Sequence, residues 1–262
     1  MTNSIRTPAV AGMFYPGDAN ELRHIIQDFL QQVKATGPVP KAIIAPHAGY
    51  VYSGPVAASV YARLVPAHDT INKVVLLGPS HRVPLNGLAA SGMQHFATPL
   101  GNIPVDRQAI NELLTLPQVS VLEQAHANEH SLEVQLPFLQ EILGDFTVIP
   151  LVVGEASSEQ VGEVLEKLWG GPETLIVISS DLSHYQDYQT AQKMDKLTSQ
   201  AIDKLRPEDI HYEQACGRNP VKGLFHVART RGLQAKTVDL RNSGDTAGPK
   251  NQVVGYGAYV FN

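Results

Sequence analysis

Residues 174–185, TLIVISSDLSHY, constrain the fold most, because a run of four branched aliphatic residues stops abruptly at polar ones. Four aliphatic residues without polar alternation predict a strand that is buried on both faces, as in sheets flanked by helices. In such sheets, ligands bind beyond the carboxyl ends of the strands. Asp181 and His184 follow this strand directly, so we expect both at a functional site.

The same arrangement occurs twice earlier in the chain. The run AIIA at 42–45 precedes His47, and the run VVLL at 74–77 precedes His81. A single loop histidine is most often structural or exposed to solvent. Three histidines that each follow a buried strand indicate a shared site instead.

The chain as a whole predicts one α/β domain over residues 1–262, with a central, largely parallel mixed sheet flanked by helices. Its 262 residues, 43% of them hydrophobic, are enough for a substantial core. No internal repeat, charge block or low-complexity linker in the sequence marks a second domain.

Hydrophobic spacing and turn residues predict the other elements. Helices are expected at 18–34 with Asp18 as N-cap, 55–64 with Pro55 in the first turn, 106–114, 129–143 with a bend or restart at Pro137, 157–169, 188–205, 207–215 and 220–231. Strands are expected at 88–90, 146–153 with a break at Pro150, 235–240 and 253–261, the last at an edge because glycine and tyrosine alternate in it. Residues 6–16 are expected to form an ordered arm, and residues 242–245 a turn.

Charge and cysteine content limit the partners and the compartment. The chain has 20 basic and 25 acidic residues, which gives no electrostatic footprint for nucleic acid or an anionic membrane. No apolar run approaches the roughly 20 residues of a membrane span, and the N-terminus lacks a secretory signal. A single cysteine, Cys216, agrees with a reducing compartment, so we expect a cytoplasmic protein.

A metal site is the chemistry that the loop histidines favour. Neutral imidazole is the commonest metal ligand among side chains, and His47 and His81 supply two. The sequence leaves the third donor open among four residues: Asp181, His184, Glu129 and Cys216. A carboxylate would favour non-haem iron(II), whereas a thiolate favours iron, zinc or copper(I). A following helix N-terminus and Arg218 are expected to lower the pKa of Cys216, although a small buried core residue is the alternative.

Other residues near these positions have two interpretations each. Asp181 either orients His184 as a general base or caps a helix that begins at Leu182. Tyr50, beside His47, either lines the cleft or packs in the core.

Residues 126–130, HANEH, match the inverted zinc-peptidase motif. A helix start at Asn128 would leave His126 outside the helix, which argues against a peptidase. Glu129 and His130 are expected to face the cleft, where they support the ligands or contact substrate.

Seven segments together carry a resemblance to a known family. They are RTPAVAGMFYP, PHAGYVYSGPVAA, LLGPSH, EHSLEVQLPFL, ISSDLSHY, ACGRNP and NSGD followed by VGYGAYVF. In this order they resemble the Memo family, whose prokaryotic members are known as the B component of the AmmeMemoRadiSam system. The resemblance implies a fold similar to the LigB-type class III extradiol dioxygenases, which use non-haem iron(II).

The resemblance also implies roles for single residues. His47, His81 and Cys216 fall on the family's metal-binding positions, and Asp181 and His184 fall on additional cleft positions. A cysteine stands where the dioxygenases have a carboxylate ligand, and a thiolate changes the charge and redox behaviour of bound iron. The resemblance includes Glu129 and His130 but not His126.

The sequence thus leads to the hypothesis of a metal-binding protein, with Fe(II) first and Cu or Zn as alternatives. As an enzyme it would carry out oxygen-dependent redox chemistry on a small substrate. The alternatives are a non-catalytic module that binds a peptide or protein in the same cleft, and a zinc hydrolase. Radical-SAM-type and AMMECR1-type system partners are implied by the resemblance alone.

Overall fold

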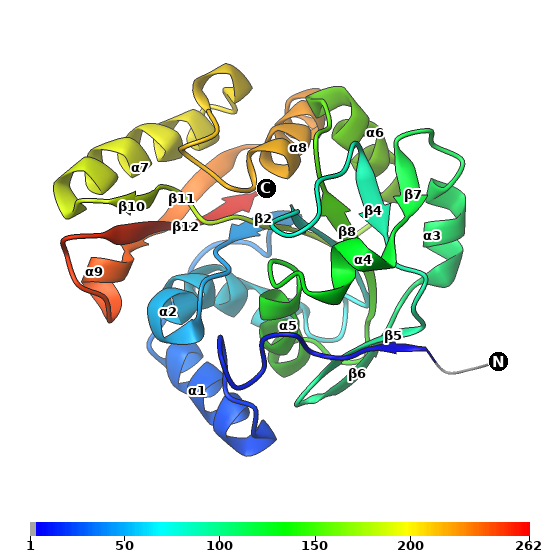
Figure 1. The fold of residues 1–262 in the computed structure, drawn as a ribbon, viewed down its shortest axis with the longest axis horizontal. Coiled ribbons are helices and arrows are strands. Elements are labelled where there is room, and N and C mark those ends of the chain that lie inside the picture. Colours follow the sequence, from blue (N-terminus) through cyan, green and yellow to red (C-terminus); the bar gives the residue numbers. More distant parts are fainter. Residues whose placement is uncertain (1–3) are drawn as a thin grey trace.

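The structure is a computed structural model that describes residues 4–262, and within that range nine strands form one mixed sheet (Figure 1). Its centre consists of β2 (Ala42–Ala45), β9 (Thr174–Ser179) and β3 (Lys73–Pro79), which are adjacent and parallel. These are the three aliphatic runs that precede polar residues in the sequence. Because parallel neighbours end on the same side, their following loops meet at one edge of the sheet.

The remaining strands extend this centre on both sides, in the order β10-β12-β2-β9-β3-β8-β4-β7, with β11 paired to β12. They are β4 (Leu88–Ala90), β7 (Val119–Val121), β8 (Thr147–Val153), β10 (His184–Gln186), β11 (Ala235–Asn242) and β12 (Val253–Phe261). The predicted α/β fold with a mixed sheet is therefore confirmed, and the parallel pairings of β2, β9, β3 and β8 form its centre.

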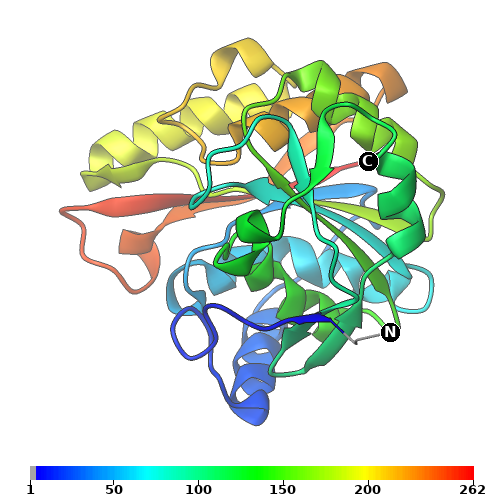
Figure 2. The same cartoon turned by 45° about the vertical axis from the view of Figure 1, so that its right-hand side comes forward.

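Helices cover both faces of the sheet (Figure 2). One layer holds α1 (Ala19–Gln31), α2 (Tyr50–Tyr61) and α5 (Leu136–Ile142), and the other holds α6 (Ser158–Leu168), α7 (Tyr188–Asp203) and α8 (Arg218–Arg231). Shorter elements are η1 (Ala62–Ala67), α3 (Arg107–Leu113), α4 (Glu123–Ala127), η2 (Glu133–Gln135), η3 (Pro207–Asp209) and α9 (Ser243–Thr246). No helix in residues 4–262 combines the length and the apolar character that a membrane span requires.

The N-terminal arm is held by a buried ion pair. A small sheet of β1 (Ile5–Arg6), β5 (His95–Thr98) and β6 (Gly101–Pro104) places Arg6 against Glu133, and both side chains are buried. The Arg6 guanidinium also donates to the carbonyl oxygens of Glu129, at 2.7 Å, and His126, at 3.1 Å. The Glu133 carboxylate in turn accepts from the Tyr15 hydroxyl at 2.6 Å. The arm therefore fixes the loop that leads to η2.

Two helical predictions need correction. Helix α2 begins at Tyr50 rather than Pro55, because the amides of Tyr52 and Ser53 already bond to the Gly49 carbonyl. Pro55 thus lies in the second turn, where its missing N–H removes one intrahelical hydrogen bond; Val51, whose carbonyl would accept that bond, is an exposed residue. The helix expected at 129–143, with a bend or restart at Pro137, is shorter: helical structure begins only at η2, and α5 follows it directly from Leu136, next to Pro137. The preceding α4 ends at Ala127, before the predicted range.

Other departures concern strands and short segments. Strand β8 runs through Pro150, which the sequence interpretation placed at a break. Pro150 is tolerated because β4 pairs only with residues 151–153 on that side, so no ladder bond needs its amide. Residues 207–215 contain only the short η3, and residues 242–245 begin the capped α9 rather than a simple turn.

Strand β12 is not the edge strand that its glycines and tyrosines suggested. It is almost entirely buried and pairs with β2, β10 and β11. Gly255 is needed there because a Cβ at that position would lie 2.0 Å from a carboxylate oxygen of Asp195 on α7. Asp195 is itself buried and accepts a hydrogen bond from the Ser183 amide at 3.0 Å.

The buried carboxyl group of Asp195 is expected to make the folding stability of the protein depend on pH. Burial raises the pKa of Asp195 to about 6, above its value of about 3.9 in an unfolded chain. The group therefore favours folding below about pH 4, and this contribution is lost as the pH rises through about 6. We expect Asp195→Asn to gain stability over the wild type between pH 4 and 8, by up to about 3 kcal/mol.

Urea denaturation of both proteins at several pH values measures this difference. The exposed Asp69→Asn variant serves as the control, and its difference from wild type is expected to stay within about 0.5 kcal/mol across the same range. A difference between wild type and Asp195→Asn that does not change with pH would contradict the prediction.

Candidate functional site

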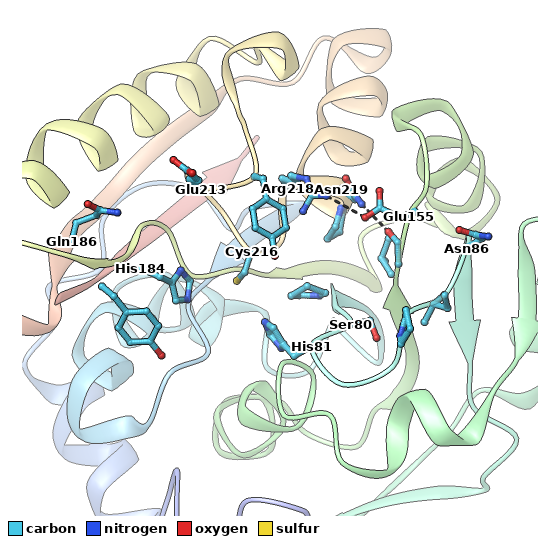
Figure 3. A pocket seen from close by; sticks show the side chains of 18 residues that line it. Ser80, His81, Asn86, Glu155, His184, Gln186, Glu213, Cys216, Arg218 and Asn219 are labelled. Atoms are coloured by element: carbon cyan, nitrogen blue, oxygen red, sulfur yellow. Dashed lines mark hydrogen bonds and ion pairs between the residues drawn. The ribbon is translucent and has the colours of Figure 1, made fainter. Parts of the chain in front are cut away.

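The loops after β2, β3 and β9 bring the expected residues together at the carboxyl edge of the sheet. Donor atoms of His47, His81 and Cys216 lie within 4.8 Å of one another. Cys216 comes from the turn before α8, far away in sequence, and its Sγ lies 3.4 Å from His47 Nε2. Figure 3 shows His81, His184 and Cys216 facing the same space. Of the four candidates for a third donor, Cys216 is the one that the structure groups with both of these histidines.

The hydrogen bonds of His47 determine its tautomer. His47 Nδ1 lies 2.8 Å from Ser179 Oγ, and this hydroxyl donates its one proton to the Ser131 carbonyl at 2.6 Å. Ser179 must therefore accept from His47 Nδ1–H. Burial lowers the pKa of His47, which keeps the ring neutral. Its Nε2 consequently presents a lone pair toward Cys216.

Glu129 orients the His81 ring in the way that Ser179 orients the His47 ring. Burial alone would raise the pKa of Glu129, but the hydrogen bond and charge of His81, with backbone amide donors, lower it to about 2. The ionised carboxylate accepts from the His81 backbone amide at 2.6 Å and from His81 Nδ1 at 2.9 Å. It also accepts from the amides of His130 and Ser131. His81 Nε2 is left free to bind a ligand or metal.

A second group of potential ligands consists of His81, Glu129 and His130. It is the weaker metal site, because the Glu129 carboxylate already accepts hydrogen bonds from several protein donors. The His130 ring stacks on the His81 ring, with centroids 4.8 Å apart and an interplanar angle of 16°. Burial lowers the pKa of His130, so this ring is also neutral. Glu129 and His130 lie in a loop rather than on the helix expected from the sequence.

The sequence predicted a lowered pKa for the Cys216 thiol, and the structure indicates the opposite. Burial, followed by the nearby charge of Asp181, raises the pKa of the Cys216 thiol in the metal-free protein. Arg218 does not counter this, because its guanidinium pairs with Glu155 at 3.2 Å and lies over the Tyr212 ring at 4.7 Å. The thiol must therefore lose its proton when a metal binds.

Asp181 occupies neither of its two predicted roles in this structure. No helix begins at Leu182, so Asp181 is not an N-cap, and the chain enters β10 instead. Its buried carboxylate accepts the backbone amide of His47 at 2.7 Å and lies 3.9 Å from His47 Nε2. Burial raises the pKa of Asp181, and the charge of His184 opposes this. Within residues 4–262, Asp181 and His184 share the cleft but form no direct hydrogen bond.

Tyr50 is placed in the core rather than in the cleft. It is 1% exposed, its hydroxyl donates to the Val134 carbonyl at 2.8 Å, and its ring lies 5.1 Å from that of Phe138. Because α2 already begins at Tyr50, the side chain of Tyr50 points into the core. Tyr52, two residues later, lines the cleft instead.

Adjoining cavities flank the site. The Cys216 cavity, of about 770 Å³, is lined by Cys216 and Arg218 among others, and the His47 cavity, of about 560 Å³, is lined by His47 and Asp181. Both contain His81, His184 and Tyr185. The lining also includes residues that sequence reasoning did not single out: Phe14, Arg82, Gln252 and Tyr256. Arg82 follows His81 directly in the sequence, so it could have been predicted to lie at the cleft.

Comparisons with known proteins agree on one family. The family described as "Memo-like protein" matches residues 6–260. A MEMO1 family protein of Aquifex aeolicus is 37% identical over 98% of this chain and 99% of its own length. Another, from Ignicoccus hospitalis, is 36% identical over 98% of both chains.

A solved structure shares the fold at low identity. The uncharacterized protein JW3007 from Escherichia coli K12 has a TM-score of 0.53, with 13% identity over 84% of this chain and 98% of its own. This likeness concerns the fold alone. The match over residues 6–260, and the relatives that share more than a third of their residues along nearly the whole chain, show that the protein belongs to the Memo family.

Proposed function

We propose that this protein is a cytoplasmic metal-binding protein in which His47, His81 and Cys216 hold the ion. The observation that carries the proposal is the convergence of three donors within 4.8 Å, with both imidazoles already oriented. Ser179 and Glu129 each engage the Nδ1 atom of one ring, so both Nε2 atoms present lone pairs. Imidazoles held in this way already have the tautomer that a metal requires, whereas the Cys216 thiol must still lose its proton.

The donor set suits an ion of intermediate softness. Two imidazoles and one thiolate suit iron(II), copper(I) and zinc, whereas magnesium and calcium prefer oxygen ligands. We favour iron(II), because three protein ligands leave coordination positions open beside sizeable cavities. Iron held there would supply oxygen-dependent redox chemistry on a small molecule.

The protein's own groups would then bind the substrate and handle protons. His184 lines both cavities beside His81, so its imidazole is placed to accept or donate a proton at a bound substrate. Asp181 accepts the His47 backbone amide and lines the same cavity, so it holds the loop that carries His47. Glu129 keeps His81 in one orientation.

Metal analysis tests the site directly. Protein purified without oxygen and titrated with iron(II) is expected to bind about one ion per chain, and His47→Ala and Cys216→Ser are each expected to weaken binding at least about 100-fold. His24→Ala removes an exposed histidine on α1 and is the matched control. Equal metal content in all four proteins would refute the site.

A second candidate is a non-catalytic module that holds a peptide in the same cleft. Exposed aromatic side chains that line the His47 cavity favour it: Tyr52 is 39% exposed and Tyr185 is 70% exposed. Oxygen consumption separates the candidates. Stoichiometric uptake with iron(II) and a panel of phenols supports the enzyme, and tight peptide binding without turnover supports the module.

A further inference from the structure

The geometry points to Tyr185 as a ligand-contacting residue, and it assigns to the cleft a planar, conjugated small molecule that stacks on the Tyr185 ring. This inference rests on the proposed function and names a substrate class for it. It starts from the backbone of β10, the short strand that carries His184 into the cleft.

Strand β10 contains a bulge at Tyr185. His184 pairs with Val254 of β12 and Gln186 pairs with Val253, so Tyr185 is the extra residue with no partner of its own. Its φ is +59°, the left-handed conformation that glycine normally supplies in such bulges. For an aromatic residue this conformation is unfavourable, and such strain is found chiefly at functional sites.

Comparison with Leu205 shows that the conformation of Tyr185 lacks a purely structural explanation. These two are the non-glycine residues with positive φ in the described range. Leu205 ends α7, and the Arg206 amide closes the helix by bonding to the Ala201 carbonyl at 2.8 Å, as in common helix C-termini. Tyr185 terminates no helix, is 70% exposed, and its hydroxyl makes no hydrogen bond within residues 4–262.

The bulge changes which side chains reach the cleft. In a regular strand, neighbours point to opposite faces, so His184 and Tyr185 would be separated. Here both line both cavities, and their ring centroids lie 5.9 Å apart. In Figure 3 the His184 ring points toward Cys216 and His81. The strained conformation therefore delivers an aromatic ring beside the proposed metal ligands.

The surroundings of Tyr185 identify the kind of ligand that uses this ring. The His47 cavity is bordered by further flat π systems, among them Phe14, Tyr52 and the stacked pair of His81 and His130. Aromatic faces interact best with other π systems in offset-stacked or edge-to-face arrangements. A planar conjugated molecule gains from these faces, whereas a saturated molecule of the same size gains only from the buried area.

A matched pair of probes tests the inference. The probes are 2-naphthol and its saturated counterpart decahydro-2-naphthol, titrated into metal-free protein and followed by protein NMR. We expect 2-naphthol to bind wild type about 3- to 10-fold more tightly than the saturated probe. Tyr185→Leu keeps an apolar side chain at the strained position but is expected to reduce this preference at least about twofold, whereas Tyr185→Phe keeps the ring and is expected to retain it.

Stability measurements complete the test. Tyr185→Gly relieves the left-handed strain and is expected to raise Tm by about 2–4 °C, which shows that the tyrosine is not kept for folding. An unchanged preference in Tyr185→Leu, a lost preference in Tyr185→Phe, no binding of 2-naphthol to wild type, or no rise in Tm for Tyr185→Gly would overturn the inference. Because binding is measured without metal, these outcomes are separate from a failure of the metal site, which the titrations of His47→Ala and Cys216→Ser reveal.

Discussion

Replacing Arg6 with alanine is expected to lower the free energy of unfolding by about 3–5 kcal/mol. The substitution leaves the Glu133 carboxylate buried without its cation, and it removes donors from the carbonyl oxygens of His126 and Glu129. Chemical denaturation at neutral pH measures the loss. The fold depends on this single arginine because burying an unpaired charge is costly, not because the pair itself is strongly favourable.

The control for this prediction is Arg23→Ala. Arg23 pairs with Glu141 at 2.9 Å, but its side chain is 46% exposed. Water replaces a lost partner at such a site, so the expected cost is below about 1 kcal/mol. Equal costs for the two arginine variants would show that the arm does not depend on the buried pair.

Glu129→Gln is expected to weaken iron(II) binding about 10- to 100-fold. The carboxylate accepts from both the backbone and Nδ1 of His81, and from the amides of His130 and Ser131. Glutamine offers one acceptor oxygen and brings an NH₂ group that faces these donors. His81 then loses the partner that fixes its ring, although none of the proposed ligands is changed.

Anaerobic titration with iron(II) measures this effect, and Glu123→Gln controls for it. The Glu123 carboxylate, on nearby α4, accepts from the Ser91 hydroxyl at 2.9 Å and from the Gly92 amide. We expect Glu123→Gln to lower stability by about 1–3 kcal/mol while its affinity for iron(II) stays within about twofold of wild type. An unchanged affinity in Glu129→Gln would mean that His81 is oriented by other contacts.

The residues that gather at the strand ends could be predicted because their signal is local. An aliphatic run such as 175–178 marks a buried strand, and the next polar residues must then lie at its end. The supporting contacts carry no local signal. Ser179 follows the same run, but its role depends on Ser131 and His47, which lie 48 and 132 positions away in the sequence.

The wrong predictions of secondary structure share a physical cause, because tertiary contacts override local sequence preferences. The apolar spacing at 129–143 indicated one helix, but the Glu129 carboxylate accepts from the amides of His81, His130 and Ser131, and helical structure begins only at Glu133. Strand β12 has an edge-like composition because its Gly255 accommodates the Asp195 carboxylate of α7. Neither partner can be identified from sequence spacing alone.

The pairing of β12 with β2 also limits how fast the protein can fold. Residues 259–261 pair with residues 42–44, so the sheet joins segments that are far apart in the sequence. Pairing between such distant segments makes folding slow. Cys216 is also far from His47 and His81 in sequence, so the three donor atoms come together only when these distant segments have packed against one another. Formation of the candidate donor set is therefore coupled to the slow pairing of distant parts of the chain.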